Sequence, residues 1–129
     1  MTATNCASRP DERQCAMLIA HLLAAKQQDL PGNRELTRAR LSEITLQRLF
    51  MRRRISPEFL AEVQEWLFRA GWVLFFAGTT YAVVKMKTVD GWGRISSERI
   101  RGDLDKVDEG GFAYDALEYL LGRFEERED

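Results

Sequence analysis

The residue types that most often carry out catalysis or bind metals are scarce in this 129-residue chain. It contains one histidine, His21, and two cysteines, Cys6 and Cys15, which are typical of the reduced thiols of an intracellular protein. A structural zinc site needs three or four clustered ligands, and these three residues have no recognised zinc-ligand spacing. Ser-His-Asp or Cys-His catalysis needs the histidine beside a nucleophile, and no nucleophile-elbow sequence is present. We therefore expect no catalytic site, no metal site and no cofactor.

A second group of chemically capable side chains lies in an acidic segment near the C-terminus. Its carboxylates are Asp103, Asp105, Asp108 and Glu109. An EF-hand calcium loop needs a glycine at its sixth position and a glutamate at its twelfth, and neither possible frame supplies both. The glycines at 91–93 and 110–111 are not followed by a phosphate-binding pattern. We expect residues 102–111 to form an acidic, solvated loop.

Arginines are the most concentrated group of charged side chains. The net charge of the chain is only −1, but residues 34–54 sum to +5, from seven arginines against two glutamates. Residues 97–129 sum to −6, from five basic against eleven acidic residues. Such asymmetry can mark a surface that faces a polyanion, beside an acidic tail that is solvated or faces a partner. A solvated helix face explains the arginines equally well, and both interpretations stay open.

Aromatic residues form a dense set in the middle of the chain. Its members are Trp66, Trp72, Phe75, Phe76, Tyr81 and Trp92. Nucleic-acid bases could stack on exposed members of such a set. Packing in the core is the favoured interpretation, because Trp66 and Trp72 are in register with an apolar helical stripe. Residues 72–77 are apolar on both faces, which suggests that a C-terminal helix or a second chain lies against them.

A helix followed directly by a hairpin is the strongest local pattern among the elements that would position these side chains. Ser56 and Pro57 are typical of an N-cap and a first helical residue. Apolar residues then recur at helical spacing, and Gly71 stands where a helix-terminating glycine belongs. The pattern predicts a helix at 57–70.

The segment after this helix has the signals of extended structure. Aromatic and β-branched runs before and after Gly78 predict a β-hairpin at 72–86. Asp90-Gly91 is a two-residue turn signal and predicts a short third strand that continues through Ile95. Ser96 or Ser97 can cap a short helical turn. Three further helices are predicted from apolar periodicity: residues 11–28, 37–52 and 112–126. We expect Ser8 to cap the first of these.

Length and composition indicate one soluble globular domain. Hydrophobic residues make up 45% of the chain and charged residues 30%, a balance that separates it from disordered proteins. The longest apolar run is far too short to cross a bilayer, and no secretory signal is visible, so we expect a cytoplasmic protein. Residues 10–95 would form its core and residues 96–129 an acidic helical extension.

This order of elements resembles the winged helix-turn-helix superfamily. The resemblance rests on three stretches: Leu41-Ser42-Glu43-Ile44 through Arg54-Ile55-Ser56, Phe59 through Ala70-Gly71-Trp72, and Trp72 to Met86 with Gly78-Thr79-Thr80 at its tip. They are similar to a second helix with its turn, to a third helix, and to a wing, and the likeness covers about residues 11–88. It implies an α+β, winged-helix-like fold: three helices, a β-hairpin wing and a C-terminal helix.

The resemblance also implies a way of binding DNA. In that superfamily the third helix commonly enters the major groove and the wing contacts the backbone or the minor groove. Here the third helix carries Glu58, Glu62 and Glu65 against a single Arg69, and phosphates repel carboxylates. We therefore expect the phosphate contacts to come from the arginines before this helix and from the wing.

Two functional hypotheses follow. The first is a non-catalytic DNA-binding regulator of transcription, and its expected contacts with double-stranded DNA are Arg38, Arg40, Arg48, Arg52, Arg53, Arg54, Thr79, Thr80, Lys85 and Lys87. The second is a protein-interaction module of the adaptor, inhibitor or antitoxin kind, which uses the C-terminal helix or the third-helix residues Glu58, Glu62, Glu65 and Phe68. The first and last predicted helices are apolar over a wide arc, which predicts a homodimer.

Overall fold

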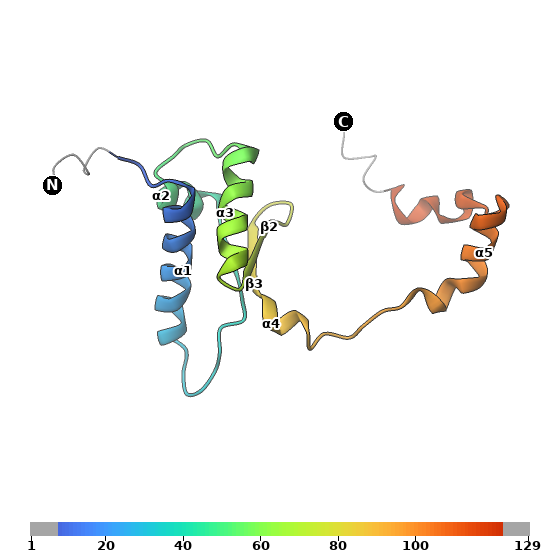
Figure 1. Cartoon of the computed structure of the whole chain (residues 1–129), viewed down its shortest axis with the longest axis horizontal. Helices are drawn as coiled ribbons and strands as arrows, with labels where there is room; N and C mark the ends of the chain where they lie inside the picture. Colours follow the sequence, from blue (N-terminus) through green and yellow to red (C-terminus); the bar gives the residue numbers. More distant parts are fainter. Residues whose placement is uncertain (1–7, 123–129) are drawn as a thin grey trace. The chain divides into compact units, whose positions relative to one another are not determined.

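The computed structural model describes residues 8–122, and the chain divides into an N-terminal unit, Met1–Trp92, and a C-terminal unit, Gly93–Asp129. The described elements of the N-terminal unit are α1 (Glu12–Gln28), β1 (Arg38–Leu41), α2 (Glu43–Phe50), α3 (Pro57–Arg69), β2 (Trp72–Phe76), β3 (Tyr81–Lys85) and α4 (Met86–Val89). Those of the C-terminal unit are two 3-10 helices, η2 (Ser97–Ile100) and η3 (Tyr114–Leu120), and the helix α5 (Arg101–Glu109) between them (Figure 1). The architecture is α+β.

The helices of the N-terminal unit begin at side-chain caps that the sequence carries. Asp11 and Gln14 form a capping box at α1, in which each side chain accepts the backbone N–H of the other residue, at 2.8 and 3.0 Å. The Ser56 hydroxyl accepts the backbone N–H of Phe59 at 3.1 Å, and Pro57 opens α3. The helices predicted at 11–28 and 57–70 are confirmed to within one residue, although Asp11 and not Ser8 caps the first.

The helix predicted at 37–52 is wrong over its first part, because Arg38–Leu41 is strand β1 and α2 contains only Glu43–Phe50. Arginine, alanine and leucine all favour helices locally, but pairing with β3 overrides this preference. The segment alternates in the period of a strand: Leu41 is buried, whereas Arg38 and Arg40 are exposed. Ser42 then caps α2 by accepting the backbone N–H of Thr45 at 3.1 Å.

The three strands form an antiparallel sheet in the order β1-β3-β2. The hairpin predicted at 72–86 is confirmed as β2 and β3, and Gly78 in its loop has a φ of 94°, which favours glycine. The third strand predicted after Asp90-Gly91 is wrong. The backbone N–H of Gly91 bonds the carbonyl of Thr88 at 3.1 Å, so the glycine closes a helical turn after α4, and β1 pairs with the free side of β3.

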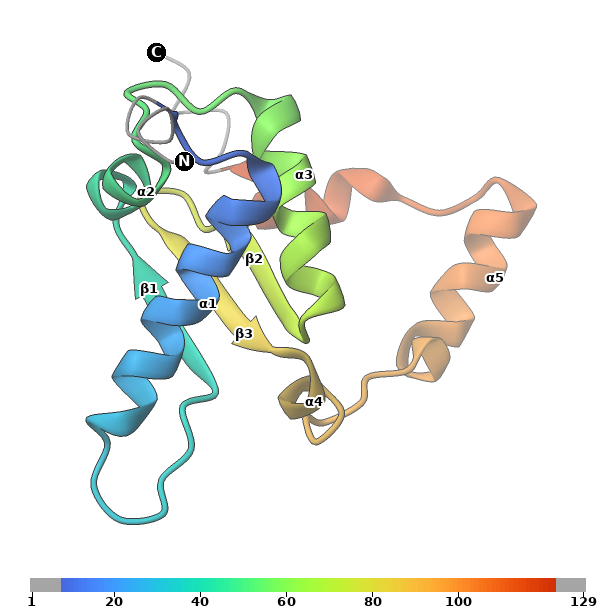
Figure 2. The same cartoon turned by 60° about the vertical axis from the view of Figure 1, so that its left-hand side comes forward.

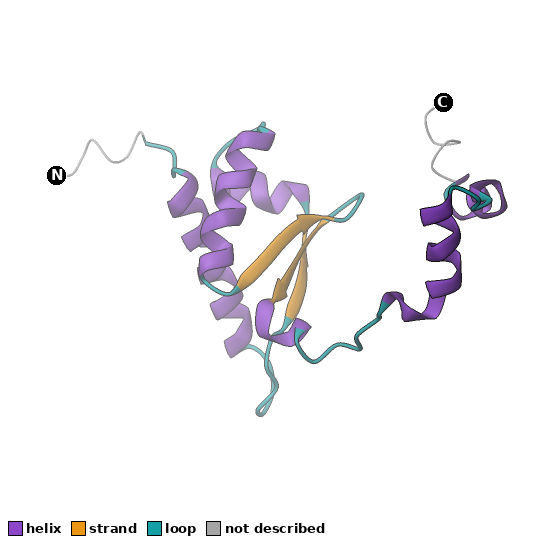
Figure 3. Ribbon diagram, turned by 45° about the vertical axis from the view of Figure 1, so that its right-hand side comes forward, coloured by secondary structure: helices purple, strands orange, loops and turns teal. Residues whose placement is uncertain are grey.

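The core lies between one face of the sheet and the helices α1, α2 and α3. Its buried residues are Cys15, Ala16, Ile19, Leu23, Leu41, Leu46, Phe50, Val63, Leu67, Leu74 and Val83. Each strand contributes one of them. Figures 2 and 3 show α1 and α3 against this face of the sheet. Because side chains alternate along a strand, the residues next to each buried one point away from these helices.

The C-terminal unit differs from its predicted structure. Residues 102–111, predicted as a loop, lie largely in α5, whose apolar residues Leu104 and Val107 are spaced, together with Ile100 at the N-cap, for one helix face. Gly110, with a φ of 82°, ends this helix, and its N–H bonds the carbonyl of Val107 at 3.0 Å. The predicted α-helix at 112–126 is 3-10 over Tyr114–Leu120, and its last four residues lie outside the described part. As predicted, Ser96 caps a short helical turn.

Within residues 8–122, the structure contains no helix with the length and apolar character needed to span a membrane.

Candidate nucleic-acid interface

The arginines predicted to contact DNA come from three elements of the N-terminal unit. Arg38 and Arg40 lie on β1, Arg48 lies on α2, and Arg53 and Arg54 lie in the turn between α2 and α3. All five are exposed. Within residues 8–122, none of them has a carboxylate oxygen within 4.0 Å. They are therefore cations whose charge no local ion pair offsets.

Arg52 lies among these residues but performs a structural role. Its Nη1 donates to the backbone carbonyl of Pro10 at 2.7 Å and to that of Phe50 at 3.0 Å. Its guanidinium carbon lies 4.1 Å from the ring centroid of Phe59. The side chain thus ties the segment before α1 to the α2–α3 turn, and its Nη1 is engaged by backbone carbonyls of the protein. Sequence could not reveal this role, because Pro10 is 42 residues away.

A cavity of about 640 Å³ opens beside this turn. Its lining residues are Arg9, Glu43, Arg52, Arg53, Arg54, Ile55, Ser56, Phe59 and Tyr81. Four guanidinium groups against one carboxylate give it a positive field, which suits an anion such as a phosphate group. The sequence singled out three of these arginines, but it did not place Arg9 beside them.

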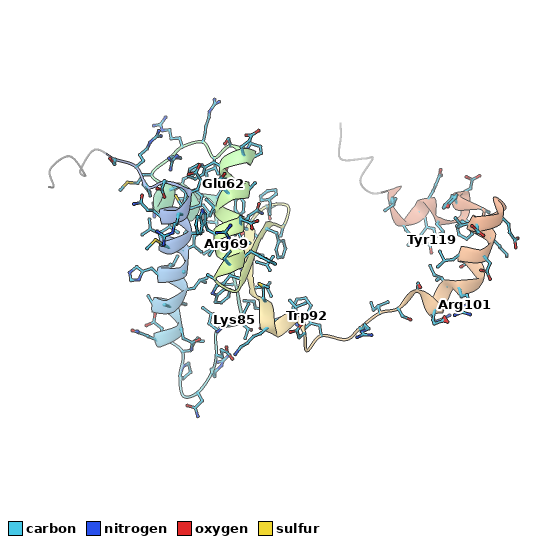
Figure 4. The ribbon with its side chains drawn as sticks, viewed as in Figure 1. Glu62, Arg69, Lys85, Trp92, Arg101 and Tyr119 are labelled. Atoms are coloured by element: carbon cyan, nitrogen blue, oxygen red, sulfur yellow. The ribbon has the colours of Figure 1, made fainter. Side chains whose placement is uncertain are left out.

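The hairpin residues predicted to contact DNA differ in how available they are. Thr79 is exposed in the loop, whereas the Thr80 hydroxyl donates to the carbonyl of Leu41 at 3.0 Å. Lys85 ends β3, whereas Lys87, predicted to lie on the wing, lies in α4. Both pair with Glu35, with Nζ–Oε2 distances of 2.8 and 3.2 Å. Hydrogen bonds from these lysines lower the pKa of the Glu35 carboxyl. One carboxylate thus offsets part of the positive charge of these two lysines. Figure 4 labels Lys85 at the end of the hairpin.

The residues of the alternative hypothesis share the solvent-exposed side of α3. Glu58, Glu62 and Glu65 are exposed and follow helical spacing, and Phe68 is 52% exposed beside them. Arg69 Nε lies 4.0 Å from Glu65 Oε2 and so offsets one of the three carboxylates. Figure 4 labels Glu62 and Arg69 on this helix. The structure thus brings this predicted set together on one element.

The remaining candidates for chemistry do not form a site. Cys15 is buried in the core, and burial raises the pKa of its thiol to about 11, which keeps it protonated and unreactive at neutral pH. His21 lines a mainly apolar cavity of about 610 Å³ with Met17 and Leu49. Among residues 8–122, no three His, Cys, Asp or Glu side chains are grouped to hold a metal ion. Cys6 lies outside the described residues.

Comparisons with protein-family models, with curated proteins and with solved structures found no match for this chain.

Proposed function

We propose that this protein is a non-catalytic, intracellular DNA-binding regulator of the winged-helix type. In this proposal the exposed arginines of β1, α2 and the α2–α3 turn contact phosphates, and the β2–β3 hairpin acts as the wing. The order of a helix, a turn and a second helix that runs directly into a hairpin supports the proposal.

The observation that carries the proposal is the lack of carboxylate partners for the arginines between 38 and 54. Elsewhere in the described chain, Arg69, Arg101, Lys85 and Lys87 have a carboxylate within 4.0 Å, whereas other arginines such as Arg13 and Arg94 have none. The arginines between 38 and 54 are distinguished by their number and by their places on consecutive elements. Unpaired guanidinium groups on neighbouring elements create a positive potential that attracts a polyanion. Phosphate binding by such groups releases counterions and is therefore strongly dependent on salt.

The acidic surface of α3 limits how DNA would be read. Glu58, Glu62 and Glu65 oppose deep insertion of this helix into a groove that phosphates line. Contacts would then be made mainly to the backbone, which positions a protein without specifying sequence. We expect binding of mixed-sequence duplexes with modest discrimination among them.

The test is fluorescence anisotropy with a labelled mixed-sequence duplex of about 20 base pairs, about two helical turns, at several salt concentrations. Replacing Arg53 and Arg54 together with alanine should reduce the slope of log K against log salt by about 1.8, since each phosphate contact contributes about 0.9. Arg69→Ala is the matched control, because Arg69 is already beside Glu65, and its slope should not change. An unchanged slope in the double variant would mean that Arg53 and Arg54 contact no phosphates and would contradict the proposal.

A protein-interaction module is the second candidate, and the exposed Phe68 beside three carboxylates favours it. An apolar ring with an acidic border fits a partner whose apolar pocket has a basic rim. Replacing Glu58, Glu62 and Glu65 with lysine should change the affinities for DNA and for a protein partner in opposite directions. DNA affinity should rise by roughly tenfold or more as repulsion is removed, whereas a complex with a basic partner should be lost.

A further inference from the structure

The sheet has a second face, which points away from α1, α2 and α3. The antiparallel register places its residues in two rows across the three strands: Arg38, Val84 and Val73 in one row, and Arg40, Ala82 and Phe75 in the next. Their neighbours along the strands, including Leu41, Val83 and Leu74, are buried against the helices. We name these six residues the outer sheet face.

The outer sheet face combines exposed cations with an exposed ring. Arg38 and Arg40 are exposed on the edge strand β1, and Phe75 is 42% exposed on the opposite edge strand β2. Ala82 lies between Arg40 and Phe75 in the central strand. Because the side chain of Ala82 is small, a flat group that lies above Ala82 can reach the ring of Phe75.

The dimensions of this surface suit a nucleotide. Strands two apart in a sheet are separated by about 10 Å, because neighbours lie about 4.8 Å apart. A base that stacks on Phe75 over Ala82 would therefore direct its phosphate towards Arg40, whose long side chain spans the remaining distance. Arg38, two residues along the same strand, is placed for the next phosphate.

We propose that the outer sheet face binds single-stranded nucleic acid, with Phe75 stacked on a base and with Arg38 and Arg40 on phosphates. Bases in a duplex are stacked on one another and present only their edges, whereas an unstacked base offers a face to an aromatic side chain. Aromatic side chains beside cationic groups are the combination that single-strand-binding surfaces use. This proposal extends beyond duplex binding: it shares Arg38 and Arg40 with that function, but it adds the ring of Phe75 and does not use Arg53 or Arg54 of the α2–α3 turn.

A simpler role for the two arginines is protection of the sheet edge, since charged side chains on edge strands discourage pairing with other chains. That role explains Arg38 and Arg40 but gives no function to the exposed ring of Phe75 on the opposite edge. The effect of removing Phe75 therefore decides between the two. Phe76 supplies a matched control: it is 55% exposed, but it belongs to the other face of the sheet, and its ring centroid lies 5.0 Å from that of Tyr81.

The experiment measures anisotropy of the full chain with labelled oligo-dT, oligo-U and a duplex, each about 15 nucleotides long, a length that spans one binding site. Phe75→Ala should weaken binding of the single strands by roughly 5- to 150-fold, the range for loss of one stacked base. Phe75→Trp should restore it, and Phe76→Ala should leave it within about twofold. Arg38→Ala combined with Arg40→Ala should reduce the salt slope for single strands by about 1.4. A preference for oligo-dT or oligo-U would show which nucleic acid is bound.

Three results would overturn the proposal: no binding of either single strand, an equal loss in Phe75→Ala and Phe76→Ala, or an affinity that Phe75→Ala does not change. The last result, with oligoglutamate competing as well as oligo-dT, would describe a general polyanion surface instead. Thermal melts of each variant confirm folding.

Arg53 and Arg54 lie outside this face, so their double variant should weaken duplex binding and leave single strands unaffected. The two proposals can therefore fail separately.

Discussion

The two units of the chain contain similar apolar patterns but bury them very differently. Eleven apolar residues of the N-terminal unit are buried among residues 8–92, seven of them with an exposure below 2%. Between residues 93 and 122 no residue is buried, although several large apolar side chains occur there. These include Ile95, Ile100, Leu104, Val107, Tyr114, Leu117, Tyr119, Leu120 and Leu121.

The difference shows what an amphipathic pattern needs in order to stabilise a fold. In the N-terminal unit, three helices bury their apolar faces on one sheet face, and each fully buried large side chain contributes about 1.5–3 kcal/mol. The nine residues of α5 have only their own cap and ion pair, and isolated helices shorter than about 12–15 residues are marginal in water. The free energy of unfolding should therefore depend on the N-terminal unit almost alone.

The largest test of this comparison applies the same substitution to both units. Leu67→Ala removes a side chain of α3 that is 0% exposed, and it should lower the free energy of unfolding by about 2–5 kcal/mol. Leu104→Ala removes one of α5 that is 42% exposed, and it should change that free energy by no more than about 0.5 kcal/mol. Urea titrations measure both. Equal losses would mean that Leu104 is buried in solution.

A second test compares two adjacent arginines. Arg52→Ala removes hydrogen bonds to the carbonyls of Pro10 and Phe50. It should lower the free energy of unfolding by about 1.5–3 kcal/mol, the contribution of bonds from a charged donor. Arg53→Ala, at an exposed position, should stay within about 0.5 kcal/mol of the natural chain. Lysine at position 52 should recover only part of the loss, because an ammonium lacks the planar fork of a guanidinium. Similar losses in both alanine variants would contradict the structural role of Arg52.

Helix caps give a smaller difference between the units. Ser56→Ala removes the acceptor for the Phe59 N–H at the start of α3 and should cost about 1 kcal/mol. Ser96→Ala removes the equivalent bond at η2, where the Ser96 hydroxyl accepts the Glu98 N–H at 3.2 Å. This second change should be undetectable in urea unfolding, since η2 buries no residue. A comparable loss at both serines would show that the units unfold as one.

Local signals made part of this structure predictable from sequence. The start of α3 at Ser56 and the hairpin around Gly78 depend on neighbouring residues, and the predictions of both are confirmed. Strand β1 was not, because its residues favour a helix until β3, about 40 positions later, pairs with them. The charge distribution predicts where the arginines cluster, but it does not predict which of them lack a carboxylate partner. The hydrogen bond from Arg52 to Pro10 depends on a distant contact. Neither Glu35 nor the outer position of Phe75 has a local signature.

The smallest effect comes from ion pairs, and it again separates distant from local contacts. Glu35 joins the segment before β1 to Lys85, 50 residues later, and to Lys87. Glu98 pairs with Arg101, only three residues later in the same short segment. Loss of this pair therefore breaks no connection between distant parts of the chain. Glu35→Gln should lower stability at neutral pH slightly, and Glu98→Gln less.

The pH dependence of this effect has a definite sign. Hydrogen bonds from Lys85 and Lys87 hold the pKa of Glu35 below its ordinary value of 4.5. The folded state therefore binds this proton less readily than the unfolded state, so the contribution is complete above that value and is lost as pH falls through the lower, folded pKa. The difference in unfolding free energy between the natural chain and Glu35→Gln should shrink over this acid range, as urea titrations at successive pH values would show. A difference that is constant with pH would mean that Glu35 contributes through packing and not through its charge.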